Sequence, residues 1–125
     1  MKNIVPTRIP VIIIALIFGY FGVNHLLHAD MMSGMVPSMF PAHKCLVYLT
    51  GICFLLAAIA FIVNRYAKVA GYLLALLLLI IICTIHLPGM MNAADDGSKM
   101  MFTTMAVKDL GLAMGAIIIA NISRQ

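Results

Sequence analysis

The side chains best suited to chemistry are three ionisable residues that lie inside long apolar segments. His25 and His86 stand near the ends of two charge-free runs, and Asp109 lies within a further apolar segment. An ionisable residue inside a membrane helix indicates a functional site, because its charge is costly and needs a partner or water. Imidazole and carboxylate groups also donate or accept hydrogen bonds. These three residues are therefore the first candidates for a polar binding site.

The segments that carry these residues have the length and composition of membrane helices. Of the 125 residues, 64% are hydrophobic and 10% are charged, whereas soluble domains are about half apolar and about a quarter charged. A helix needs about 20 mostly apolar residues to cross a bilayer. Four stretches qualify, at about 9–28, 45–63, 69–87 and 103–122. The prediction is an all-α integral membrane protein, in which a single domain over 1–125 forms an antiparallel bundle of four transmembrane helices.

Local signals predict where the later helices end and begin. The Pro88-Gly89 pair is a strong breaker and is expected to end the third span. The charge-free stretch 110–123 is too short to cross a bilayer alone, so the fourth helix must begin earlier. Ser98 is the predicted N-cap of a helix from Lys99 to about Ile122.

Basic residues predict how the bundle is oriented. The termini and the link between the second and third spans carry basic residues and no acidic residue: Lys2, Arg8, Arg65, Lys68 and Arg124. The other side carries lysines and all the aspartates: Lys44, Lys99, Lys108, Asp30, Asp95, Asp96 and Asp109. Since basic residues collect on the cytoplasmic side, both termini are predicted to be cytoplasmic. No basic patch with interleaved aromatics indicates a nucleic-acid partner.

The polar residues inside the spans fall at one depth in this topology. With a rise of about 1.5 Å per residue, His25 lies about 24 Å from Ile9 and His86 about 25 Å from Val69. Asp109 lies about 20 Å from the inner boundary, and Asn24 and Met105 fall close to the same level. All four histidines and most methionines lie in this outer half: His25, His28, His43, His86, Met31, Met32, Met35, Met39, Met90, Met91, Met100, Met101 and Met105. We expect an outer-facing polar pocket beneath the Met-rich link from 30 to 44.

Simpler interpretations of the same residues stay open. Asp109 can sit in an interfacial turn beside a snorkelling Lys108. His25 and His86 can be hydrogen-bonding residues that hold helices together. The methionines can fill irregular gaps in packing.

Metal and thiol chemistry receive weaker support. His25/His28 and Cys83/His86 are pairs at i, i+3 spacing, which can place two donors on one helix face and would suit a soft ion such as copper. No CxxC or HExxH motif is present, so a metal is not expected. Cys45 and Cys83 are the only candidate disulfide pair, but all three cysteines are expected to be small buried hydrophobes. With no catalytic motif either, a binding or accessory protein is favoured over an enzyme.

Small residues in the last span predict close helix packing. Gly111 and Gly115 form a G-x-x-x-G pair, and Ala116 and Ala120 form a second pair beside it. Such a face allows close helix approach, either inside the bundle or against another membrane protein or a second copy.

Across nearly the whole chain, the order of several residues resembles the DoxX family of small prokaryotic membrane proteins. The elements of the resemblance are Arg8, Gly22-Val23-Asn24-His25, Met35-Val36-Pro37 followed by Pro41, Thr50-Gly51, Arg65 and His86. The resemblance implies a four-helix bundle in the prokaryotic cytoplasmic (inner) membrane, with His25, Pro37 and Pro41 as distinctive positions. It further implies roles linked to quinone-coupled sulfur oxidation, thiol redox balance or other membrane proteins. Many relatives carry a Glu after the Ser/Thr-Gly of span two, where this chain has Ile52, Cys53 and Phe54.

Together these observations lead to a functional hypothesis with two alternatives. The hypothesis is a redox-linked accessory protein that binds a small lipophilic or quinone-like molecule in the outer pocket. Its expected contacts are His25, His86, Asp109, Asn24, Met105, Pro37 and Pro41. One alternative is a structural subunit or assembly factor that works through Gly111, Gly115 and the outer links. The other is a copper or thiol-redox protein that uses His25, His28, Cys83 and His86.

Overall fold

Helices are the regular secondary structure of the part of the chain that the structure describes, which is residues 4–34 and 42–124 of a computed structural model, and no strand occurs in these residues. The elements are α1 (Arg8–Leu27), α2 (Ala29–Ser33), α3 (His43–Val63), α4 (Ala67–Ile81), η1 (Ile82–His86), α5 (Leu87–Met91) and α6 (Asp96–Ile122). Here η1 is a turn of π-helix, and it joins α4 to α5 in one helical segment of 25 residues, Ala67–Met91.

The helices have the surface of a membrane protein. Four of them are long and apolar enough to cross a bilayer: Arg8–Leu27, His43–Val63, Ala67–Met91 and Asp96–Ile122. Between 22% and 33% of the most apolar stretch of each is buried inside the protein, so large apolar side chains such as Leu73, Leu76 and Ile118 point outward. Such a surface is stable only against lipid. The predicted all-α, four-helix membrane fold is therefore confirmed, and the chain is a multi-pass membrane protein.

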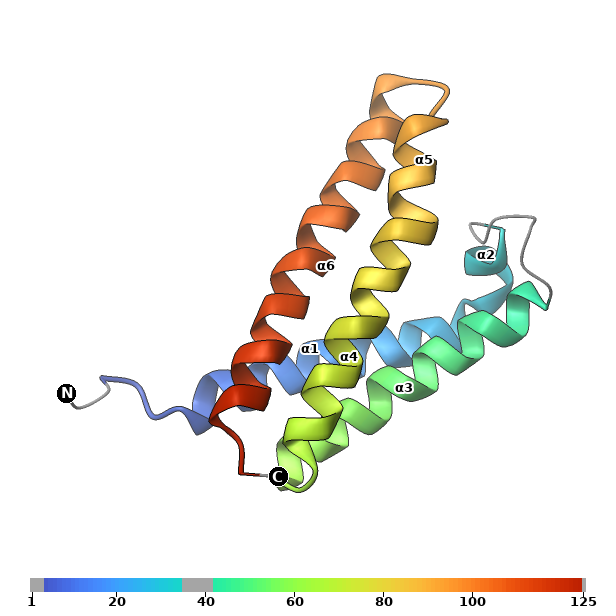
Figure 1. Cartoon of the computed structure of the whole chain (residues 1–125). Coiled ribbons are helices and arrows are strands. Elements are labelled where there is room, and N and C mark those ends of the chain that lie inside the picture. The colour runs from blue at the N-terminus through green and yellow to red at the C-terminus, as the bar shows by residue number, and fades with distance from the viewer. Residues whose placement is uncertain (1–3, 35–41, 125) are drawn as a thin grey trace.

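The helices pair into two hairpins. The first hairpin is α1 packed along α3, and the second hairpin is α4 to α5 packed along α6. Figure 1 shows that the hairpins lie close together near the turn between α3 and α4 and separate toward α2 and α5. We refer to these as the closed end and the open end.

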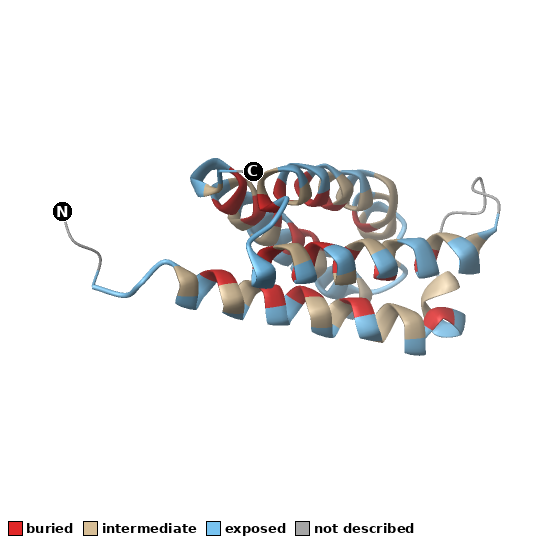
Figure 2. Ribbon diagram, turned by 90° about the horizontal axis from the view of Figure 1, so that it is seen from below, coloured by how far each residue is buried: buried red, intermediate tan, exposed pale blue. Residues whose placement is uncertain are grey.

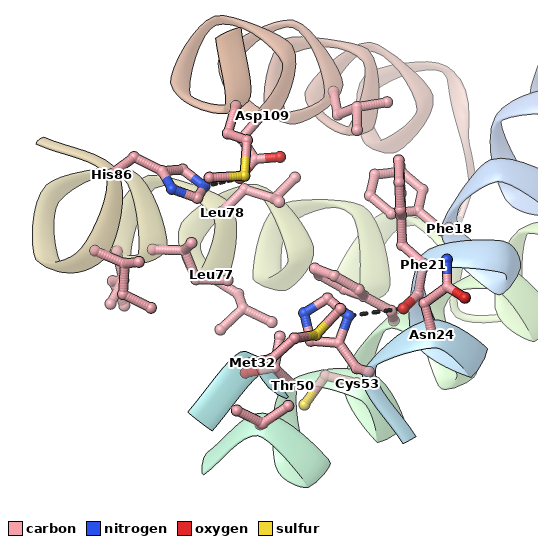
Figure 3. Close-up of a pocket in the computed structure, with 18 of the residues that line it drawn as sticks. Phe18, Phe21, Asn24, Met32, Thr50, Cys53, Leu77, Leu78, His86 and Asp109 are labelled. Carbon is pink, nitrogen blue, oxygen red and sulfur yellow. Dashed lines mark hydrogen bonds and ion pairs between the residues drawn. The ribbon is translucent and has the colours of Figure 1, made fainter. Parts of the chain in front are cut away.

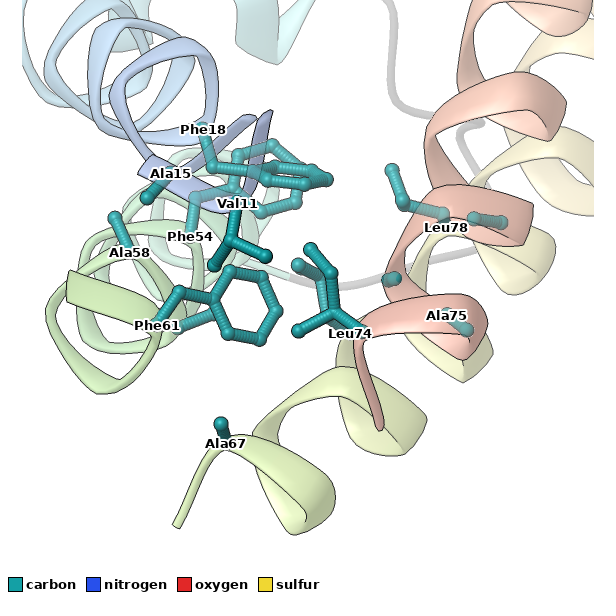
Figure 4. Close-up of a cluster of buried hydrophobic side chains, with 14 residues drawn as sticks. Val11, Ala15, Phe18, Phe54, Ala58, Phe61, Ala67, Leu74, Ala75 and Leu78 are labelled. Atoms are coloured by element: carbon teal, nitrogen blue, oxygen red, sulfur yellow. The ribbon is translucent and has the colours of Figure 1, made fainter. Parts of the chain in front are cut away.

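An aromatic and aliphatic core joins the two hairpins toward the closed end. Phe18 contacts Phe54 and Phe61, with ring centroids 5.8 and 6.4 Å away. From the second hairpin, Leu74 and Leu78 complete this cluster (Figure 4). Seen from below, the buried positions face inward between the helices (Figure 2). This core holds one end of the molecule shut.

Arg8 also fastens the closed end. Its guanidinium donates hydrogen bonds to the carbonyl oxygens of Phe61 (3.0 Å) and Ile62 (2.6 Å), in the last turn of α3. Those carbonyls have no partner within the helix, because the helix stops at Val63. One arginine therefore satisfies the end of α3 and ties α1 to it.

Glycines set how closely the helices approach within each hairpin. A Cβ built on Gly22 would lie 2.9 Å from the carbonyl oxygen of Gly51, and one built on Gly71 would lie 2.6 Å from the carbonyl oxygen of Ala116. Neither position has room for a side chain. The backbones can meet there only because these residues are glycine.

The predicted helix end at Pro88-Gly89 is wrong. The helix continues through both residues to Met91. Pro88 lies directly after the π-turn, where the regular i→i−4 hydrogen bonding of the helix is already interrupted, so its missing N–H is tolerated there. Gly89 packs against Phe102, since a Cβ built there would lie 2.5 Å from the ring. A local breaker signal is overridden here by tertiary packing.

The predicted N-cap of the last helix is also wrong. The cap is Asp95, whose carboxylate accepts a hydrogen bond from the backbone N–H of Ser98 at 2.6 Å. Ser98 thus belongs to the first turn of α6, which begins at Asp96. A carboxylate accepts that hydrogen bond and also complements the positive end of the helix dipole, which favours aspartate at this position.

Candidate functional site

A cavity of about 590 Å³ lies between the two hairpins. Much of its lining is aromatic or aliphatic, from Phe18, Phe21, Phe54, Leu77 and Leu78 among others. Figure 3 shows His86 and Asp109 on one side of the cavity, and Asn24, Thr50 and Cys53 on the other. The cavity therefore has two walls, the first formed by α1 and α3 and the second by α4, η1 and α6.

On the second wall, the imidazole of His86 and the carboxylate of Asp109 are buried against each other. Nε2 of His86 lies 2.7 Å from Oδ2 of Asp109, and each residue is 6% exposed. Lys108 places its ammonium 3.3 Å from the other carboxylate oxygen. Asp109 therefore faces the interior of the bundle, and the exposed Lys108 lies beside it. The other ring nitrogen, Nδ1 of His86, is buried without a hydrogen-bond partner among the described residues.

The π-turn decides which residue of this region faces inward. In η1 each backbone hydrogen bond spans one residue more than in an α-helix, and the N–H of Leu87 bonds to the carbonyl oxygen of Ile82, five residues back. As a result His86 is buried while Cys83 is exposed. The predicted placement of Cys83 and His86 on one helix face is wrong, because that spacing rule applies to regular α-helix.

His25 on the first wall makes its polar contact within its own helix. Its Nδ1 donates a hydrogen bond to the carbonyl oxygen of Phe21 at 2.7 Å. The ring meets Phe54 edge to face, with centroids 5.2 Å apart and an angle of 81°. A Cβ built on Gly51 would lie 2.8 Å from the Cβ of His25, so the histidine packs directly on the α3 backbone. The ring is therefore held in one orientation beside the cavity.

The three residues predicted to share one layer line one cavity but do not form one cluster. His25, His86 and Asp109 all line it, together with Asn24 and Met105. Only His86 and Asp109 touch, and no hydrogen bond or ion pair links His25 to either of them in the described part of the chain. The predicted contacts Pro37 and Pro41 lie outside the described residues.

Lys108 also belongs to the site, although the sequence indicates only a lysine that snorkels to the membrane surface. Its ammonium lies 4.2 Å from the centroid of the Phe21 ring, a cation–π contact from α6 to α1. It therefore connects the two walls. Thr50 and Cys53 also line the cavity. Both residues lie on the predicted second span, but nothing in a single sequence marks which face of that span points inward.

The small residues of the last span divide between two surroundings. Ala116 and Ala120 are buried against Gly71, and Gly115 faces Ile14, whose Cδ1 lies 3.5 Å from a Cβ built there. A Cβ built on Gly111 meets nothing within 4 Å. Packing inside the bundle thus uses three of the four predicted positions, which leaves one glycine open to another chain.

Metal ligands and cysteines are arranged as follows in the part of the chain that the structure describes. No group of three or more His, Cys, Asp or Glu side chains is placed so that it could hold a metal ion. Cys45, Cys53 and Cys83 are free thiols. The expectation that all three are buried is wrong for Cys45 and Cys83, which are exposed on the outside of their helices.

Comparison with known proteins corrects the family assignment. A family model described as a domain of unknown function, DUF8561, matches residues 14–124. No curated protein and no solved structure matches the chain. The resemblance to the DoxX family is therefore wrong as an assignment, because the match over nearly the whole chain is to a different family. The chain belongs to the DUF8561 family.

Proposed function

We propose that this protein binds a small lipophilic molecule with a polar head group in the cavity between its two hairpins. The observation that carries the proposal is the cavity itself, whose volume of about 590 Å³ falls in the usual range of ligand sites, about 300 to 1,000 Å³. Its lining also has the usual character of such sites, with apolar walls and a few polar groups.

The positions of the polar groups support an amphiphile rather than a pure hydrocarbon. His25 and Thr50 on one wall and His86 with Asp109 on the other all line the same space. Each of these groups already has one partner within the protein, but an apolar molecule alone would leave Nε2 of His25 and the remaining acceptor capacity of Thr50 without a partner, at a cost in free energy. A molecule with an apolar body and one polar end satisfies both kinds of surface. Quinone-like redox carriers are one class of this description.

The role that we propose is accessory rather than catalytic. Among the described residues that line the cavity, the hydroxyls of Thr50 and Thr84 bond to backbone carbonyl oxygens, and the thiol of Cys53 makes no hydrogen bond to a histidine or a carboxylate. Such a site can hold a lipid-soluble molecule and present it to another membrane protein.

We also propose that both termini face the cytoplasm, so that the cavity lies toward the opposite side. Arg65 lies in the turn between α3 and α4, Lys68 lies in the first turn of α4, and Arg8 bonds to the last turn of α3. Figure 1 shows that α6, which stops just before Arg124, ends at the same end of the bundle. This concentration of basic residues at one end supports the orientation. The proposal concerns orientation alone, since a prokaryotic inner membrane was implied only by the DoxX resemblance.

The experiment uses a side chain that fills the cavity. Cys53 lines the cavity, whereas Cys45 is exposed on the same helix and does not line it. The wild-type protein, Cys53→Trp and Cys45→Trp would be purified in lipid nanodiscs, and bound lipophiles would be extracted and identified by mass spectrometry. We expect a defined small lipophile to co-purify with the wild type and with Cys45→Trp. The amount of this molecule should be at least fivefold lower in the Cys53→Trp preparation.

Equal amounts of every extracted lipophile in all three preparations would contradict the proposal. Thermal unfolding of each variant serves as the folding control, because Cys53→Trp must remain folded for its result to count. A reporter fused to the C-terminus, active only in the cytoplasm, tests the orientation separately.

A further inference from the structure

Most hydrogens on the half-buried polar groups of the cavity are already used within the protein. Nδ1 of His25 donates to the carbonyl oxygen of Phe21. The hydroxyl of Thr50 donates to the carbonyl oxygen of Leu46 at 3.0 Å, and that of Thr84 donates to Ile80 at 2.7 Å. A neutral imidazole has one N–H and a hydroxyl has one hydrogen. These side chains can therefore only accept a hydrogen bond from a ligand.

The tautomer of His25 follows from the chemistry of its partner. A backbone carbonyl oxygen has no hydrogen, so the hydrogen of this bond must be on Nδ1. In the neutral ring, Nε2 is then an acceptor, and no protein group bonds to it in the described part of the chain. The edge-to-face contact with Phe54 and the packing on Gly51 hold the ring in place. His25 thus presents a fixed acceptor to the cavity.

The carboxylate on the second wall is already compensated. Asp109 accepts a hydrogen bond from Nε2 of His86 and faces the ammonium of Lys108 at 3.3 Å. A cationic ligand would therefore meet the positive charge of Lys108 beside Asp109, the acidic residue among the described residues of the lining. The remaining donors of the lining are the amide of Asn24, the ammonium of Lys108 and the hydroxyl of Tyr20, of which the last two belong to exposed residues. At His25, Thr50 and Thr84 the cavity consequently favours an uncharged donor.

Building on the proposed function, we infer that the head group bound in this cavity is a hydroxyl, such as that of a phenol or an alcohol, which donates its hydrogen to Nε2 of His25. A ligand with carbonyl oxygens alone finds no free hydrogen at His25, Thr50 or Thr84. This deepens the proposed function by naming the chemistry of the ligand: a lipid-soluble molecule with a hydroxyl is bound in preference to its carbonyl or ether counterpart.

A matched pair of probes tests this preference. 4-Octylphenol and its methyl ether share an apolar body and differ in the hydroxyl hydrogen. Equilibrium dialysis of the isotopically labelled probes against the full chain in nanodiscs, with Cys53→Trp as the background, measures specific binding. We expect the wild type to bind the phenol about 3- to 10-fold more tightly than the ether, which is the usual worth of one hydrogen bond. His25→Phe should abolish that ratio.

Two further variants make the assignment specific. His28→Phe is the same substitution at an exposed histidine that does not line the cavity, and it should retain the full preference. Thr50→Val removes the neighbouring acceptor with little change of shape, and it should leave the ratio largely intact. Loss of the preference with Thr50→Val but not with His25→Phe would overturn the role of His25.

The remaining outcomes separate the two proposals. Equal binding of the phenol and the ether above the Cys53→Trp background would overturn the hydroxyl inference and leave the proposed lipophile site standing. Binding of neither probe above that background would count against the proposed function itself, and the inference would fall with it.

Discussion

Each hairpin carries a histidine inside a membrane helix, and the two histidines find their hydrogen-bond partners in different ways. In the first hairpin, His25 bonds to the carbonyl oxygen of Phe21 one turn back in its own helix. In the second, His86 bonds to Asp109 on a different helix and leaves Nδ1 buried without a described partner. The first solution is local and leaves one nitrogen for a ligand. The second is tertiary and makes the polar wall part of what holds the hairpin together.

This difference has a physical consequence for stability and for binding. Removing His25 costs the protein little, because the carbonyl oxygen of Phe21 can bond within its own helix. Removing one partner of the His86–Asp109 pair leaves a buried polar group unsatisfied, which is costly in an apolar environment. We therefore expect substitutions of the polar residues in the second hairpin to lower mainly the stability of the fold, and those in the first hairpin to change mainly the selectivity for ligands.

The largest effect should come from Asp109→Ala. This change leaves Nε2 of His86 and the ammonium of Lys108 without their shared acceptor. Hydrogen bonds to charged groups contribute about 1.5 to 3 kcal/mol each, and the exposed Lys108 contact contributes less, so we expect a loss of about 2 to 3 kcal/mol in the free energy of unfolding. Titration with a denaturing detergent in mixed micelles, followed by circular dichroism, measures it.

His25→Leu is the comparison from the first hairpin, with an expected loss below about 1 kcal/mol. Asp96→Ala, an exposed aspartate on the same helix as Asp109, controls for the loss of an acidic side chain and should have a small effect. Losses of equal size for Asp109→Ala and His25→Leu would show that the contrast between the hairpins is wrong.

The next effect concerns the glycines at which helices meet. Gly71→Ala would place a Cβ 2.6 Å from a backbone carbonyl oxygen, and Gly51→Ala would place one 2.8 Å from the Cβ of His25. Both should destabilise by about 1 to 3 kcal/mol because the helices must separate. Gly111→Ala meets nothing within 4 Å and should stabilise by up to about 1 kcal/mol through helix propensity. The same detergent titration would refute this scheme if the three variants behaved alike.

A smaller effect should come from the contact that links the hairpins. Lys108→Met removes the cation–π contact with Phe21, which is worth about 0.5 to 1 kcal/mol. Because Lys108 also faces Asp109, a double-mutant cycle with Phe21→Leu isolates the contact between the hairpins. Lys99→Met, an exposed lysine elsewhere on α6, is the control. A coupling energy near zero would mean that Lys108 and Phe21 do not connect the walls.

The smallest effect should come from the cap of α6. The backbone N–H of Ser98 donates to the carboxylate of Asp95 and thereby lowers the pKa of that group below its usual value. The charged form is favoured in the folded state, so the cap is fully present above the ordinary pKa of aspartate and is lost as the pH falls through the lowered pKa. Asp95→Ala should speed amide exchange in the first turn of α6, measured near neutral pH.

Asp95→Asn separates capping from charge. Asparagine also caps helices, so this variant should keep slow amide exchange in the first turn of α6 and lose its dependence on acid. If Asp95→Ala exchanged as slowly as the wild type, the cap would not hold this turn.

The sequence by itself determined the fold class, the number of apolar helices and the end of the molecule at which polar residues gather. Each follows from the length of charge-free runs and the cost of placing charge in lipid, which act on any chain regardless of packing. A motif-based family assignment did not follow in the same way. The short motifs of glycine, histidine and proline that resemble DoxX did not decide the family, because the match over 14–124 is to another family.

Only the tertiary structure decided which polar residues meet. Depth along the helices placed His25, His86 and Asp109 in one layer, but contact depends on how each helix is rotated. That rotation is set by the π-turn before Leu87 and by the backbone contacts at the hairpin glycines. Because of the same packing, the helical segment Ala67–Met91 continues past Pro88, and Cys83 points away from His86. Rotation and close approach arise from contacts between distant segments, and so no local pattern in the sequence encodes them.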